Sequence, residues 1–256
     1  MTTYMPILPL GMLHLFDECD IGDAFILPQF WNIPEYRDFY TSRKWLRVII
    51  DNALYENPVA YDVSELAEIA DSISSMTTHI VGPEKIGDGS TTTNLMLNAI
   101  AEHGPRGSKW SLMSVFQGSS YEMYRSYEIL KEYRIGFAFP VSMYRQGWSR
   151  SGLKYFTGIR NHYVHALGID DLTEIPDLVR AGFDSFDSSI VATAAVNGID
   201  LLGTELRIMR RGDPSDPVRV NLMHTEFHED VIDATACNID DIKSTIGSIK
   251  IEAKGV

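Results

Sequence analysis

IPDLVRAGFDSFDSS, at residues 175–189, carries the pattern that decides the fold. An apolar, helix-like run from Ile175 to Ala181 ends at Gly182, and a short apolar strand, Phe183–Phe186, follows. We expect this strand to present Asp187 at its carboxyl end. In (β/α)8 barrels the catalytic groups sit at the carboxyl ends of the strands. The stretch therefore predicts one helix-to-strand unit of such a barrel, with a carboxylate in a functional position.

The same alternation of apolar and amphipathic segments runs along the chain. Apolar runs predict strands at Ala24–Phe30, Leu46–Ile50, His79–Gly82, Trp110–Phe116, Ile135–Phe139, His162–Leu167 and Phe183–Phe186, with Ile7–Leu10 and Ile190–Ala195 as weaker candidates. Helical spacing predicts helices at Val63–Ser74 (with Asp62 as N-cap), Asn94–Glu102, Tyr121–Tyr133 and Leu172–Ala181. Strands that alternate with helices predict a mostly parallel sheet.

Seven or eight strands in 256 residues favour a (β/α)8, TIM-type barrel over an open doubly wound sheet. No glycine-rich dinucleotide loop follows the first predicted strand, which further disfavours a Rossmann fold. We expect a single domain over residues 1–256, with 199–256 as a C-terminal extension whose structure the pattern leaves open. Within it, Ile239–Ile251 is expected to form a terminal helix or a strand pair, and residues 210–217 an exposed turn.

Composition narrows the class of protein. The 45% apolar content suits one ordinary globular domain, and two cysteines are too few for a disulfide framework. No run of about 18 apolar residues predicts a membrane span, and the N-terminus lacks the pattern of a secretory signal, so we expect a cytoplasmic protein. The net charge of -13 argues against a protein that wraps nucleic acid electrostatically.

Polar residues recur at the ends of the predicted strands. They are Asp51, Glu84 (with Asp88 close behind), Gln117-Gly118, His165 and Asp187, while Gly136 opens a strand with bare backbone that a flat ligand can approach. In a barrel the carboxyl ends of the strands converge on one mouth. Carboxylates accept from ring N–H groups and exocyclic amines, and a glutamine amide matches a carbonyl. The set suits a planar, donor-rich heterocycle.

Each of these residues also has a structural interpretation. A strand-end Asp is often only a helix N-cap, and Gln117-Gly118 is a polar turn before a helix. Glu84 alone is a solvated loop acid, and His165, among apolar neighbours, is more often a core histidine than a catalyst. The functional interpretation depends on their recurrence at successive strand ends.

Several segments resemble the tRNA-guanine transglycosylases. The pattern Gly-Φ-Asp-x-Phe-Asp at residues 182–187 is similar to the family's nucleophile segment, and the remaining similar segments are LMSVFQGS (112–119), IGFA (135–138), HYVHALG (162–168), Asn197-Gly198 and IIDN (49–52). Phe137 replaces the family's second glycine in the Ile-Gly-Gly strand, and Asp51 is followed by Asn52 rather than by Ser-Gly-Gly. The resemblance covers residues 46–198.

The resemblance implies a pentosyltransferase that exchanges bases. Carried over by position, Asp187 would be the nucleophile that forms a covalent aspartyl-glycosyl intermediate, and Asp51 the general acid/base. Glu84 or Asp88 would replace the family's base-reading Asp, and Gln117, Gly118, Gly136 and His165 would complete the base-binding set.

Two departures affect the substrate that the resemblance implies. The tRNA enzymes have a Cys-x-Cys-x-x-Cys…His zinc site, whereas this chain offers only His224, His228 and Cys237, the two histidines being spaced to share a helix face. A metal-free, cofactor-free protein is favoured. The family's arginine-rich segment is also missing. In both departures the chain is most similar to the short phage and bacterial members of the family, which put 7-deazaguanine bases, such as 7-cyano-7-deazaguanine, into DNA.

A candidate DNA contact lies at residues 144–154, where Arg145, Trp148, Arg150 and Lys154 combine cations with an aromatic ring. An exposed loop with a partly buried Trp is the equal alternative. Arg207, Arg210 and Arg211 form a second basic cluster, interpreted as an ordinary solvated face.

Three alternatives to a DNA base-exchange enzyme stay open. The first is a tRNA-guanine transglycosylase, which the acidic composition and the missing zinc cluster disfavour. The second is a barrel hydrolase or lyase acting on a free nucleoside or sugar, which the net charge favours because a small substrate needs no basic face. The third is a non-catalytic subunit, against which Asp51 and Asp187 argue. A homodimer, or a partner subunit that supplies a basic surface, is compatible with all of them.

Overall fold

The computed structural model describes residues 2–55, 57, 59–107, 109–140, 156, 158–169, 172–197 and 220–254. It is an α/β structure with one eight-stranded sheet in the order β1-β8-β7-β6-β5-β4-β3-β2. The strand pairs with a determined register are all parallel. Sequential parallel strands, with β8 paired back onto β1, form the arrangement of a nearly closed (β/α)8 barrel, so the predicted TIM-type fold class is confirmed.

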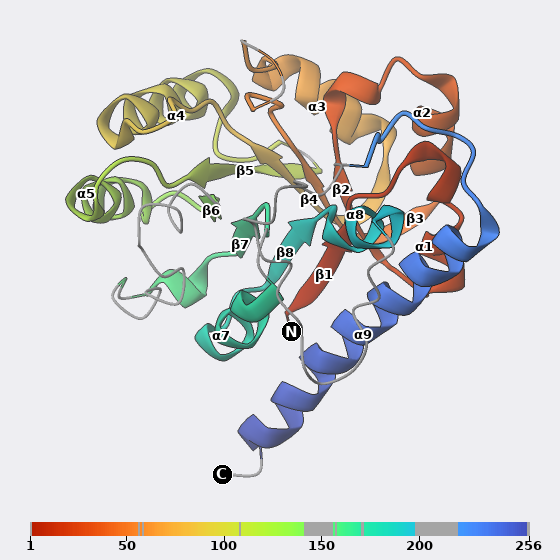
Figure 1. Cartoon of the computed structure of the whole chain (residues 1–256). Coiled ribbons are helices and arrows are strands. Elements are labelled where there is room, and N and C mark those ends of the chain that lie inside the picture. Colours follow the sequence, from red (N-terminus) through yellow and green to blue (C-terminus); the bar gives the residue numbers. More distant parts are fainter. Residues whose placement is uncertain are drawn as a thin grey trace. The chain divides into compact units, whose positions relative to one another are not determined.

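The chain divides into two compact units, one of residues 22–165 and one of residues 1–21 with 166–256. The strands of the first are β2 (Asp23–Ile26), β3 (Lys44–Ile50), β4 (Ser74–Val81), β5 (Trp110–Val115) and β6 (Gly136–Pro140). Its helices are α2 (Pro34–Thr41), α3 (Val63–Ser72), α4 (Gly89–His103) and α5 (Ser120–Leu130), with 3-10 turns η2 (Pro28–Phe30) and η4 (Ile159–Asn161). In Figure 1, α4 and α5 lie side by side next to β5.

Local signals explain where these helices begin. Asp62 caps α3 through a reciprocal capping box with Glu65, as the sequence predicts for that residue. Ser119 and Glu122 form the same box at α5. The predicted helix at Asn94–Glu102 starts earlier, at Gly89, because Asp88 accepts a hydrogen bond from the Thr91 N–H and caps α4 there.

The second unit contains β1 (Thr3–Pro6), η1 (Leu10–Met12), α1 (Leu15–Glu18), η5 (Leu172–Glu174), α7 (Ile175–Ala181), β8 (Ser185–Ser188), α8 (Ile190–Val196) and α9 (Glu229–Lys254). Strand β7 (Val164–Leu167) crosses the boundary between the units. Helix α9 packs against α7, α8 and β1, burying Ile239, Ile242 and Ile246. The described part of the predicted C-terminal extension is thus a long helix that belongs to the core of this unit.

Several predicted elements are corrected. Ile190–Ala195 is the helix α8 rather than a strand, because a short, fully buried apolar run has no periodicity that separates the two. The first strand is Thr3–Pro6, not Ile7–Leu10, and the strand predicted at Ala24–Phe30 stops at Ile26 because Pro28 opens a 3-10 turn. No helix of the described residues is long and apolar enough to cross a membrane.

Candidate functional site

A cluster of polar side chains lies at the carboxyl ends of β3, β4 and β5. Glu84, which follows β4, accepts a hydrogen bond from Nε2 of Gln117 at 2.5 Å and one from Nδ2 of Asn52 at 3.2 Å. The two amides approach different carboxylate oxygens, Oε2 and Oε1 respectively. All three side chains are buried. We call Asn52, Glu84 and Gln117 the strand-end cluster.

Backbone groups determine which way both amides of the strand-end cluster face. Asn52 donates a second hydrogen bond from Nδ2 to the carbonyl of Gly82 at 2.9 Å, and its Oδ1 accepts from the Leu54 N–H at 3.0 Å. The Gly87 N–H donates to Oε1 of Gln117 at 2.9 Å. Each amide therefore directs its NH2 group at Glu84, whose two carboxylate oxygens accept one hydrogen bond each.

The electrostatics of Glu84 follow from its burial. Removal from water raises the pKa of its carboxyl, and the hydrogen bonds from Gln117 and Asn52 lower it without cancelling the rise. A carboxyl of this kind changes protonation at a higher pH than a solvated glutamate. It accepts hydrogen bonds when ionised, and when protonated it adds a donor for a carbonyl or ring nitrogen.

Asp51 precedes the cluster directly, at the end of β3. Its Oδ2 accepts a hydrogen bond from the Ala53 N–H at 3.2 Å, and Ala53 has a φ of 55°. The left-handed region is unusual for a non-glycine residue and is common at functional sites. Burial raises the pKa of Tyr36, and the charge of Asp51 adds to that rise, so the two side chains lie near one another.

Asp187 lies within β8, not beyond its end, because the strand runs from Ser185 to Ser188. Its side chain is buried, and Oδ1 accepts a hydrogen bond from the Gly168 N–H at 2.9 Å. Burial raises the pKa of Tyr4, and the charge of Asp187 adds to the rise. The carboxylate of Asp187 is thus held in one orientation beside the end of β7.

The other predicted base-binding residues do not join the strand-end cluster. Asp88 caps α4, and Gly118, with a φ of 79°, forms the turn into α5, where a Cβ would meet Glu122 at 2.6 Å. Gly136 opens β6 and pairs with Met113, four residues before Gln117. His165 is fully buried and stacks on Phe25 with ring centroids 5.7 Å apart.

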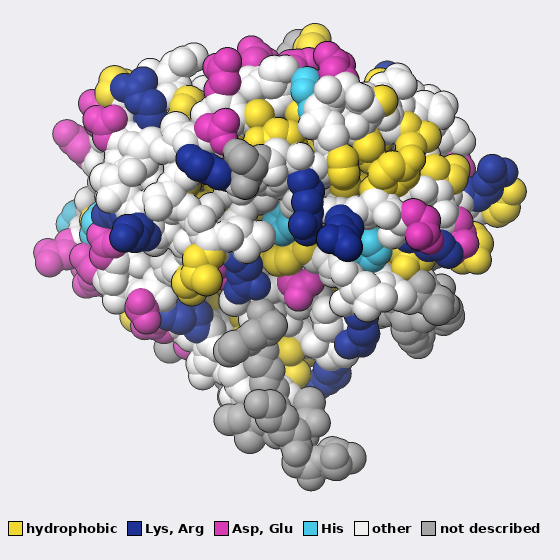
Figure 2. Space-filling view, turned by 180° about the vertical axis from the view of Figure 1, so that it is seen from behind, with side chains coloured by type: hydrophobic (Ala, Val, Ile, Leu, Met, Phe, Trp, Pro, Cys, Tyr) yellow, Lys and Arg dark blue, Asp and Glu magenta, His cyan; other side chains and the backbone are white. Residues whose placement is uncertain are grey.

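The predicted nucleic-acid contacts Arg145, Trp148, Arg150 and Lys154 lie outside the described residues, as do Arg207, Arg210 and Arg211. On the face drawn in Figure 2, Lys and Arg side chains are scattered among acidic and neutral ones.

His224 and His228 do not share a helix face as predicted, since α9 begins at Glu229 and the His228 carbonyl accepts its first hydrogen bonds. No group of three His, Cys, Asp or Glu side chains in the described part of the chain is arranged to hold a metal ion.

Sequence reasoning missed three residues: Asn52, Tyr36 and His79. Asn52 follows β3 and donates a hydrogen bond to Glu84. Its position directly after Asp51, at a predicted strand end, could have marked it as a site residue. Tyr36 lies on α2, and nothing in its local sequence links it to Asp51. His79 was assigned only to a strand, although a histidine within a buried apolar run is a candidate for a polar role.

Comparison with known proteins adds no family assignment: no family model matches the chain, and no curated protein sequence matches it.

Proposed function

We propose that the chain is a base-exchange glycosyltransferase that replaces guanine in DNA with a 7-deazaguanine base. The observation that carries the proposal is the strand-end cluster. The carboxyl of Glu84, held by two oriented amides, keeps acceptor lone pairs, and Gln117 keeps one amide N–H, which together suit the edge of a guanine-like heterocycle. In this proposal Glu84 and Gln117 read the base, and a free 7-deazaguanine is the second substrate.

The proposed reaction has two displacements at C1′ of the target nucleoside. The carboxylate of Asp187 bonds to C1′ as the C1′–N9 bond breaks, and the bonding electrons leave with guanine, which takes a proton from Asp51. Asp51 then removes the N9 proton of the incoming base, whose N9 attacks C1′ and releases the Asp187 carboxylate. A base inside a duplex must first leave the stack.

The hydrogen bond from the Gly168 N–H to Asp187 supports the nucleophile assignment, because an attacking carboxylate has to be held in one orientation. The position of Asp51 beside a left-handed Ala53 supports its assignment, since backbone strain concentrates at functional sites.

A second candidate function is hydrolysis or lysis of a free nucleoside or sugar by the same carboxylates. The net charge of -13 favours it. A small substrate needs no extended basic surface, whereas nucleic acid binding gains most of its affinity from one.

The test is to incubate the purified protein with radiolabelled guanine and one polymer at a time: duplex DNA, single-stranded DNA or bulk tRNA. A separate reaction with free deoxyguanosine measures release of guanine. The proposal predicts label in DNA, loss of incorporation in Asp187→Asn, and a strong fall in rate in Asp51→Asn. The matched control is Asp177→Asn, an exposed aspartate on α7. Circular dichroism checks that each variant is folded.

The outcomes separate the candidates. Label in tRNA but not in DNA would identify the tRNA enzyme. Guanine released from deoxyguanosine, with no label in any polymer, would identify the small-substrate hydrolase. Incorporation by Asp187→Asn at the wild-type rate would remove Asp187 as the nucleophile.

A further inference from the structure

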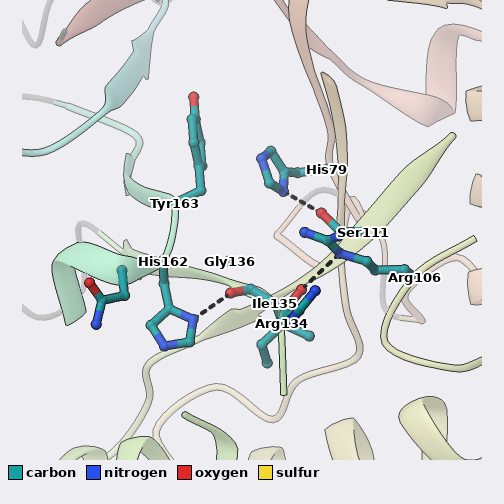
Figure 3. A pocket seen from close by; sticks show the side chains of 9 residues that line it. His79, Arg106, Ser111, Arg134, Ile135, Gly136, His162 and Tyr163 are labelled. Atoms are coloured by element: carbon teal, nitrogen blue, oxygen red, sulfur yellow. Dashed lines mark hydrogen bonds between the residues drawn. The ribbon is translucent and has the colours of Figure 1, made fainter. Parts of the chain in front are cut away.

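A cavity of about 230 Å³ lies in the unit of residues 22–165, away from the strand-end cluster. Its lining comes from the amino ends of β5 and β6, from β4 and from the segment before β7. The lining residues are His79, Arg106, Ser111, Arg134, Ile135, Gly136, Asn161, His162 and Tyr163. Figure 3 shows His79 and Tyr163 on one side of the cavity, with Arg134 and His162 on the other.

The lining contains cations and neutral donors but no carboxylate. Nε of Arg106 donates to the backbone carbonyl of Arg134 at 3.4 Å, which holds the Arg106 side chain beside the backbone of Arg134. Within the described part of the chain, neither guanidinium forms an ion pair. Both arginines line the same cavity, so an anion bound there is attracted by two positive charges.

The deeper part of the cavity is buried and polar. His79 is only 5% exposed, its Nδ1 is hydrogen-bonded to the Ser111 hydroxyl at 2.8 Å, and its Nε2 has no hydrogen-bond partner among the described residues. The Tyr163 ring stacks on the His79 ring with centroids 4.3 Å apart. Buried polar atoms are normally satisfied, so an orphaned nitrogen calls for an explanation such as a ligand or a bound water.

The charges around His79 have one sign. Its pKa is lowered to about 3, chiefly by burial and to a smaller extent by electrostatic interactions with His165, Arg106 and Arg47. His79 is therefore neutral at physiological pH, and the fixed positive charge at the cavity comes from the arginines. The field at the site favours an anion.

We propose that this cavity binds a small phosphorylated molecule, with the phosphate between Arg106 and Arg134 and the organic part against Tyr163 and His79. Guanidinium groups bind phosphate with charge-assisted, bidentate hydrogen bonds, and the three terminal oxygens of a phosphate monoester accept more donors than the two of a carboxylate. Asn161 adds an amide donor to the lining. The volume is below the ~300–1,000 Å³ of drug-sized ligand sites, so the ligand is small.

Gly136 lines this cavity at a point where neighbouring groups approach its backbone closely. A Cβ at this residue would meet Met113 Cε at 3.2 Å, the Tyr163 carbonyl at 3.3 Å and His79 Nδ1 at 3.5 Å. The bare backbone of Gly136, which the sequence led us to expect near a flat ligand, thus lines this cavity. The proposal is independent of the proposed base-exchange function.

Isothermal titration calorimetry with inorganic phosphate, ribose 5-phosphate, ribose and succinate tests the proposal. We expect ribose 5-phosphate to bind in the millimolar range or tighter, inorganic phosphate to bind more weakly, and ribose not to bind. Arg106→Gln and Arg134→Gln should each weaken binding about tenfold or more, the equivalent of one lost charge-assisted hydrogen bond. The hydrogen bond from Arg106 Nε should persist in Arg134→Gln, because its acceptor is the backbone carbonyl of residue 134.

The matched control is Arg125→Gln, an exposed arginine on α5 outside the cavity, which should leave binding unchanged. Affinity for inorganic phosphate equal to that for ribose 5-phosphate would assign the site to free phosphate. Three results would overturn the proposal: no binding of either phosphate compound, succinate binding as tightly as both, or full affinity in the double variant Arg106→Gln, Arg134→Gln.

Discussion

Replacing Gln117 by methionine tests the strand-end cluster most directly. Methionine is close to glutamine in length and volume but has no amide. The substitution removes the Nε2 donor 2.5 Å from Glu84 and the Oε1 acceptor of the Gly87 N–H. Gly87 is exposed, so water replaces its lost partner, whereas Glu84 is buried and has no such replacement. The cost therefore arises almost entirely at Glu84.

The magnitude follows from a lost hydrogen bond to a buried charge. Such bonds contribute about 1.5–3 kcal/mol, so we expect Gln117→Met to lower the free energy of unfolding by about 2–3 kcal/mol at neutral pH. The hydrogen bond from Gln117 is the largest contribution that lowers the pKa of Glu84, so its loss raises that pKa further.

The pH dependence has a definite sign. A carboxyl whose pKa is raised by folding contributes stability below its ordinary pKa, and that stability is lost as pH rises through the folded-state value. In the variant, the folded-state pKa of Glu84 is higher than in the wild type. The variant therefore loses more stability as pH rises from the ordinary pKa of a glutamate to the folded-state value. The destabilisation should be larger at about pH 8 than at about pH 5.

Urea unfolding monitored by circular dichroism at both pH values measures these differences. Gln29→Met is the matched control, because Oε1 of Gln29 is buried without a hydrogen-bond partner among the described residues, and we expect little loss of stability there. In a Glu84→Gln background the Gln117→Met substitution should cost less, because no buried charge depends on it. A loss below about 0.5 kcal/mol in the single variant, or one that shrinks as pH rises, would refute the reasoning.

Three further predictions concern local structure. Asp62→Ala removes the α3 cap and should lower the free energy of unfolding, measured with urea, by about 1 kcal/mol. The hydrogen bond from the Ser64 N–H holds the pKa of the Asp62 carboxyl below its usual range, so the difference between variant and wild type should disappear in acid. Gly182→Ala forces a side chain onto a φ of 85° at the end of α7 and should lower stability by about 1–2 kcal/mol, whereas no change would mean that this turn adapts. Cys237 is exposed and should react quickly with iodoacetamide. Cys19 is buried, and burial raises the pKa of its thiol to about 11, so it should react only in denaturant. Equal rates for the two cysteines, measured by mass spectrometry, would contradict this.

The sequence by itself predicted the class of fold and many of its elements. The helix that ends at Gly182, the cap at Asp62 and the strands that become β3, β5 and β6 each have a signal within a few residues of the sequence. Periodicity and capping are local signals, so a single chain displays them. The apolar run at Ile190–Ala195 failed as a signal because a short buried helix and a buried strand have the same composition.

Tertiary structure decided which polar residues meet. Glu84 and Gln117 were predicted in one base-binding set and do meet, but Asn52, which completes the cluster, was missed. Gly136 and His165 were expected in that set, but the structure places Gly136 against His79 and stacks His165 on Phe25. Register between strands separates these groups: Gly136 pairs with Met113, four residues before Gln117. Local sequence determines that a residue lies in a strand, but only the packing of neighbouring strands sets its level in the sheet, because register depends on contacts between residues distant in the chain.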